Sequence, residues 1–161
     1  MLVIGVGIGY MLRPGTPSES TDMRMLSQQV SDLKEMMMLS MLEKESATDR
    51  LRAVSLSRDI DEASAKVTSA LVETLNRDEN INVRLAALDA LKPYARQSEV
   101  RQELIRSIAK QESPLVQIAL AELMVQLQAK SSVKELEKLM ESENTPPDVK
   151  KKIKESIDVL I

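Results

Sequence analysis

The 161-residue chain contains no cysteine and no histidine. Without cysteine it can form no disulfide, no thiolate metal site and no thiol nucleophile, and this absence is compatible with either redox compartment. Without histidine it lacks the commonest general base and the commonest metal ligand, and its serines have no histidine partner for nucleophilic catalysis. We therefore expect no catalytic residue, no metal site and no cofactor, and interpret the chain as a non-enzymatic protein.

Glycine and aromatic residues are scarce as well. All four glycines lie at or before Gly15, so the rest of the chain has no glycine-rich loop of the kind that cradles phosphate. Aromatic residues make up 1% of the chain, and the core must be built from Leu, Ile, Val, Ala and Met. This composition suits a nucleic-acid binder that stacks bases on aromatic side chains poorly, and a net charge of −3 provides no basic footprint. We expect no nucleic-acid partner.

What the chain does contain is a repeat. Two series of valines share a period of 33 residues: Val67, Val100 and Val133, and Val83, Val116 and Val149. A fixed period between about 20 and 50 residues is typical of solenoids, in which each unit contacts mainly its neighbours. Two interleaved series indicate two helices per unit. The pattern predicts an all-α fold: an α-solenoid of about four helix pairs, with a long N-terminal helix and an apolar anchor.

Helix start and stop signals agree with this period. Asn80, Ser113 and Thr145 precede the second helix of three successive units, and Ser113 and Thr145 are each followed by proline. Pro93 lies late in one of these helices and is expected to end or kink it.

A fourth, degenerate unit precedes these three. Residues 49–54 align with residues 83–88 at an offset of 34, and Thr48 is a candidate N-cap for this first copy. The repeat domain is therefore predicted to span residues 46–161.

The N-terminal residues 1–13 form an apolar segment, followed by a polar linker at residues 14–22. A membrane-spanning helix needs about 20 apolar residues, so this segment is too short to span alone. It could be the h-region of a signal peptide, a buried apolar tail, or the second half of a membrane helix that begins upstream. We favour the last, because Tyr10 and Arg13 lie where interfacial anchors belong.

Residues 23–45 are predicted to form a methionine-rich helix with a coiled-coil-like seam. Apolar residues spaced three and four apart continue from Met23 through Leu26, Val30, Leu33 and Met37. The last four are candidates for self-association, although two heptads are few for a dimer. The C-terminal half of the helix is apolar nearly all round and is expected to cap the solenoid.

Candidate partner-binding residues lie near the start of the second helices. Arg84, Gln117 and Lys150 occupy equivalent positions, and Lys151 extends a basic run. One interpretation places them on a concave surface along which a partner helix or peptide docks. The alternatives are structural: a hydrogen bond from Arg84 to a turn residue such as Asp78, and a solvated face for the lysines.

The stretches "NRDENINVRLAALDALKPY" and "QESPLVQIALAELMVQL" resemble HEAT repeats, and the resemblance covers residues 64–161. The order of apolar segment, linker, methionine-rich helix and repeats is similar to bacterial membrane proteins with an N-terminal zinc-finger anti-sigma-factor domain. That zinc finger is absent here, since the chain has no Cys or His. The resemblance implies an anchor in the bacterial inner membrane through residues 1–13 and an extracytoplasmic HEAT domain. It also implies a scaffold or an anti-sigma-factor-like regulator that binds a protein or peptide. The alternative is a homodimeric spacer or a soluble HEAT adaptor, assembled through residues 23–42.

Overall fold

The computed structural model describes residues 17–60 and 63–161. Within them the regular structure is helical, with eight α-helices and three short 3₁₀ turns. The helices form four consecutive antiparallel pairs, and each pair packs against the next. The predicted α-solenoid is confirmed for this part of the chain, whereas the predicted apolar anchor at residues 1–13 lies outside the described residues.

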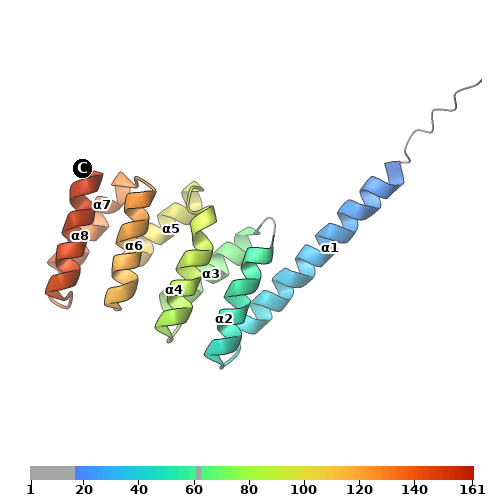
Figure 1. Cartoon of the computed structure of the whole chain (residues 1–161), viewed down its shortest axis with the longest axis horizontal. Coiled ribbons are helices and arrows are strands. Elements are labelled where there is room, and N and C mark those ends of the chain that lie inside the picture. Colours follow the sequence, from blue (N-terminus) through green and yellow to red (C-terminus); the bar gives the residue numbers. More distant parts are fainter. Residues whose placement is uncertain (1–16, 61–62) are drawn as a thin grey trace, which may run out of the picture.

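The solenoid has two layers (Figure 1). One layer contains the first helix of each pair: α1 (Pro17–Leu42), α3 (Ala65–Arg77), α5 (Ser98–Ile108) and α7 (Val133–Glu141). The other contains the second helix of each pair: α2 (Ala47–Leu56), α4 (Ile81–Leu91), α6 (Pro114–Gln126) and α8 (Pro147–Leu160). The N-terminal part of α1 extends away from the stacked pairs.

The core between the layers consists of aliphatic residues and methionine, as the composition predicts. Among the periodic valines of the sequence, Val67, Val83 and Val116 are fully buried, and Val100 and Val149 nearly so. Val133 is partly buried and packs against the same core. The 33-residue period therefore records one inward-facing position on each helix.

Polar caps and proline set the helix boundaries. The side chain of Asn80 caps α4 by accepting a hydrogen bond from the backbone N–H of Asn82, as predicted. α4 ends at Leu91, where a 3₁₀ turn that contains Pro93 follows it, which confirms the predicted stop. The prediction for α2 was wrong by two residues: Ser46, not Thr48, is its N-cap and accepts from the backbone N–H of Asp49.

The first helix also differs from its predicted bounds. It begins at Pro17, inside the expected 14–22 linker, and ends at Leu42 instead of residue 45. Proline suits a first helical residue, because its φ is already fixed near the helical value and its missing N–H would be unpaired there anyway. Because Pro17 lies among polar residues, it was interpreted as part of a linker, although it starts α1.

Candidate protein-binding surfaces

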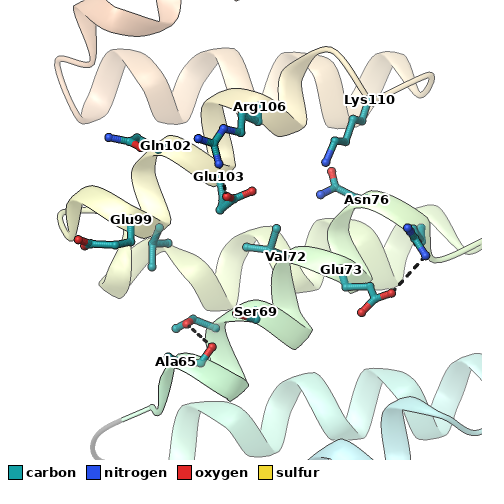
Figure 2. Close-up of a pocket in the computed structure, with 13 residues that line it drawn as sticks. Ala65, Ser69, Val72, Glu73, Asn76, Glu99, Gln102, Glu103, Arg106 and Lys110 are labelled. Atoms are coloured by element: carbon teal, nitrogen blue, oxygen red, sulfur yellow. Dashed lines mark hydrogen bonds and ion pairs between the residues drawn. The ribbon is translucent and has the colours of Figure 1, made fainter.

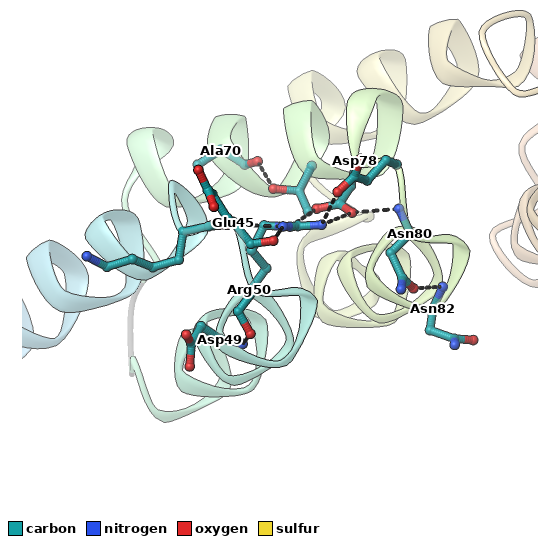
Figure 3. A network of polar contacts seen from close by, with 11 residues as sticks. Glu45, Asp49, Arg50, Ala70, Asp78, Asn80 and Asn82 are labelled. Carbon is teal, nitrogen blue, oxygen red and sulfur yellow. Dashed lines mark hydrogen bonds and ion pairs between the residues drawn. The ribbon is translucent and has the colours of Figure 1, made fainter.

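A buried arginine network joins the first helix pair to the second (Figure 3). Arg50 of α2 binds Asp78 in the α3–α4 turn through both carboxylate oxygens, at Nε–Oδ2 2.7 Å and Nη2–Oδ1 3.0 Å. Its Nη1 donates to the backbone carbonyls of Lys44 and Glu45 at 3.0 and 2.6 Å. The hydrogen bond to Asp78 raises the pKa of Arg50 above its ordinary value. Because Asp78 also accepts from the backbone N–H of Asn80, this one pair fixes two turns.

The contact with the turn that was considered for Arg84 is therefore made by a different arginine. One interpretation of the sequence paired Arg84 with a turn residue such as Asp78, but Asp78 pairs with Arg50 of the preceding unit. The Nε of Arg84 is buried and has no hydrogen-bond partner among the described residues. The alignment of residues 49–54 with residues 83–88 already placed Arg50 in register with Arg84, so the signal was present in the sequence. The missing information was that the arginine reaches forward to the next unit.

Gln117 lies inside the solenoid. It is 4% exposed, and its Nε2 donates to the backbone carbonyl of Gln111 at 2.8 Å. Gln111 in turn donates to the carbonyl of Leu75 and to Asn76 Oδ1, which links the third helix pair to the second. The side-chain oxygens of Gln111 and Gln117 lack a donor within the described part of the chain.

The four candidate partner-binding residues thus form no common exposed surface. Lys150 is partly exposed and Lys151 is exposed, whereas Gln117 is buried and Arg84 is partly buried. Their role in partner binding stays a prediction, and Gln117 is in addition a structural residue.

The candidate self-association residues are exposed along one side of α1. Leu26, Val30, Leu33 and Met37 have 57%, 46%, 62% and 56% of their surface exposed. Residues on another side of the same helix attach it to the solenoid: Met38 is fully buried, and Glu35 accepts a hydrogen bond from Ser64 at the start of α3. α1 therefore has two faces with different roles, one packed and one free within the described structure.

An open groove of about 900 Å³ runs between α3 and α5 (Figure 2). A second hollow of about 910 Å³ lies between α1 and α3 and shares Ala65, Ser69 and Glu73 with it. By contrast, a hollow between α4 and α6 measures about 160 Å³. The sequence analysis expected a partner along the second helices, but these spacious hollows lie in the layer of first helices.

The walls of the α3–α5 groove are polar and charged, and its floor is apolar. Val72 lies between the walls, and Val100, in the first turn of α5, also lines the groove. The charged residues that line it are Glu73, Arg77, Glu99, Glu103, Arg106 and Lys110. Positive and negative side chains are equal in number, so the groove as a whole favours neither an acidic nor a basic ligand. A ligand would therefore be selected by the order of positive and negative side chains along the groove, not by their net charge.

Comparison with known proteins identifies the repeat. The family of HEAT repeats matches residues 68–158, more than half of the chain. The chain belongs to the HEAT-repeat family. The match begins within α3 and ends within α8, so it covers the three regular helix pairs. No curated protein and no solved structure gave a significant match.

HEAT repeats are typically non-enzymatic modules that bind other proteins, which agrees with the class of function inferred from the sequence. The resemblance to bacterial membrane proteins with an anti-sigma-factor domain stays a prediction. Across residues 17–60 and 63–161, no helix combines the length and hydropathy that crossing a bilayer requires.

Proposed function

We propose that this HEAT-repeat protein is a non-enzymatic interaction module that holds a segment of a partner protein in the α3–α5 groove. The observation that carries the proposal is the groove itself: an open hollow of about 900 Å³ with an apolar floor and polar walls. Binding sites for polypeptides combine these two features, because the apolar contacts supply affinity and a few polar groups fix orientation.

The dimensions of the groove fit a short segment. α3 has 13 residues, which corresponds to a length of about 20 Å at 1.5 Å per residue. An extended chain of about six residues covers that distance. The neighbouring α1–α3 hollow shares one wall with the groove and gives a longer partner room to continue toward α1.

Selection from a random peptide library displayed on phage tests the proposal. The full chain is expected to enrich a peptide family, and Ser69→Arg is expected to weaken its best member at least about tenfold in an isothermal titration. Ser69 is exposed on α3 and lines the groove, so arginine fills the groove without disturbing the core.

Leu115→Arg on α6 is the matched control, because Leu115 is 60% exposed on the layer of second helices. Its affinity should stay within about twofold of wild type. Loss of binding in Leu115→Arg but not in Ser69→Arg would assign the partner to the other layer. Failure of the library to yield any binder would contradict the interaction function.

Self-association through α1 is a second candidate function. The exposed seam from Leu26 to Met37 supports it, because an apolar stripe with coiled-coil spacing is stabilised when it pairs with another helix. In this function the solenoid is a spacer or assembly surface carried by a homodimer.

Sedimentation equilibrium of the purified full chain distinguishes this candidate. We expect a concentration-dependent dimer that Leu33→Glu shifts to monomer, since a buried unpaired carboxylate is costly. Met25→Glu is the control, because Met25 is also exposed on α1 but lies outside the seam. A strict monomer at high concentration would exclude a homodimeric function.

Membrane placement is a further part of the proposal. We infer that residues 1–13 hold the HEAT domain at the bacterial inner membrane, on the extracytoplasmic side, as a scaffold or anti-sigma-factor-like regulator. The support is the apolar composition of these residues and the order of segments that follows them. Mass spectrometry of native membrane and soluble fractions tests this, and recovery in the soluble fraction alone would overturn it.

A further inference from the structure

The two ends of the α3–α5 groove carry opposite charges. Arg77 is the last residue of α3, Lys110 lies two residues past the end of α5, and Glu99 lies in the first turn of α5. Figure 2 shows Lys110 beside Asn76 at one end of the groove and Glu99 at the other. A ligand in the groove therefore meets a basic end and an acidic end.

The other charged residues of the groove are already paired. Arg77 contacts Glu73 at 3.4 Å, and Arg106 contacts Glu103, in each case on the same helix. Lys110 and Glu99 have no ion-pair partner within residues 17–60 and 63–161. The pKa of Glu99 is lowered, mainly by a hydrogen bond from the Ser98 side chain, so its carboxylate is ionised at neutral pH. The unpaired charges are thus one cation and one anion at opposite ends.

Between the two ends the groove offers apolar and hydrogen-bonding contacts. Val72 and Val100 form the apolar part, and Ser69, Asn76 and Gln102 add hydroxyl and amide groups. Asn76 already accepts a bond from Gln111, which leaves its NH₂ group as a donor. Such side chains can bond the free backbone groups of an extended segment, whereas a helical segment has satisfied its own.

We propose that the groove selects an extended partner segment with an acidic side chain at the Lys110 end and a basic side chain at the Glu99 end. The inference rests on the proposed function and adds the charges of the partner segment and the end of the groove at which each lies. Glu99 lies in the first turn of α5 and Lys110 two residues past its end, a separation of about 16 Å, so the two charged side chains of the partner are about five residues apart. Small or apolar residues between them face Val72.

Charge reversal tests this inference with the same phage library. Wild type is expected to enrich peptides with one acidic and one basic residue about five positions apart. Lys110→Glu is expected to weaken the best peptide about tenfold, and reversing the acidic residue of that peptide is expected to restore binding. Lys110 is exposed, so the substitution leaves the core intact.

Lys130→Glu is the matched control, because Lys130 is an exposed lysine outside the groove. It should select the same peptides as wild type. If binding is blocked by Ser69→Arg but Lys110→Glu still selects the wild-type motif, the inference on charge fails and the proposed function stands. If the reversed peptide does not regain affinity for Lys110→Glu, the assignment of the acidic end is likewise overturned.

Discussion

Replacing Arg50 with methionine is expected to lower the free energy of unfolding by about 3 kcal/mol. The substitution keeps an unbranched apolar stem but leaves the Asp78 carboxylate, which is 5% exposed, without its cation. It also removes the donors to the carbonyls of Lys44 and Glu45. Breaking a buried pair from one side is costly because the remaining charge stays desolvated. Urea denaturation followed by circular dichroism measures the change.

Arg58→Met provides the matched control. Arg58 also connects the first pair to the second, through Asp89 of α4, but both side chains are about half exposed. Lys92 contacts the same carboxylate at 2.9 Å and is the main cause of the lowered pKa of Asp89, whereas Arg58 contributes less. The control should therefore cost less than about 1 kcal/mol. Equal losses for the two variants would show that the Arg50 network contributes no more than a surface ion pair.

Met38→Ala is expected to cost about 3 kcal/mol, whereas Met37→Ala should change stability by less than about 0.5 kcal/mol. The two residues are neighbours on α1, but Met38 is fully buried in the core and Met37 is 56% exposed. Removing buried methylene groups loses their transfer free energy and leaves a cavity. The same denaturation measurement compares both variants with wild type.

The contrast between the two methionines also tests how α1 is held. A similar loss for both would mean that the seam of α1 is covered in solution, as in the homodimer. A small loss for both would mean that α1 contributes little to the stability of the solenoid, which the full burial of Met38 contradicts.

The repetitive part of the fold could be predicted because its signals are local. The valine period marks one inward-facing position on each helix from α3 to α8, and Asn80 and Pro93 mark the ends of α4 where the structure has them. The start of α1 was missed because Pro17 followed by polar residues is compatible with both a linker and a helix start.

The candidate site depended on information that the repeat does not contain. The period relates Arg50 to Arg84, but which carboxylate each arginine reaches depends on how one unit stacks on the next. Likewise, Glu99, Arg106 and Lys110 appear in the sequence as ordinary surface charges of an amphipathic helix. They line a groove only because α3 and α5 are spaced apart, and this spacing is a property of packing between units.

The uneven polar contacts between successive helix pairs have a mechanical consequence. A solenoid bends by small rotations between neighbouring units, because each unit contacts only the next. The first junction is held by the buried ion pair of Arg50 and Asp78, whereas the second is held by the neutral hydrogen bonds of Gln111 to Leu75 and Asn76. The α3–α5 groove crosses the second junction. A segment bound there would contact both helix pairs and restrict rotation between them, so occupancy of the groove and bending of the solenoid are coupled.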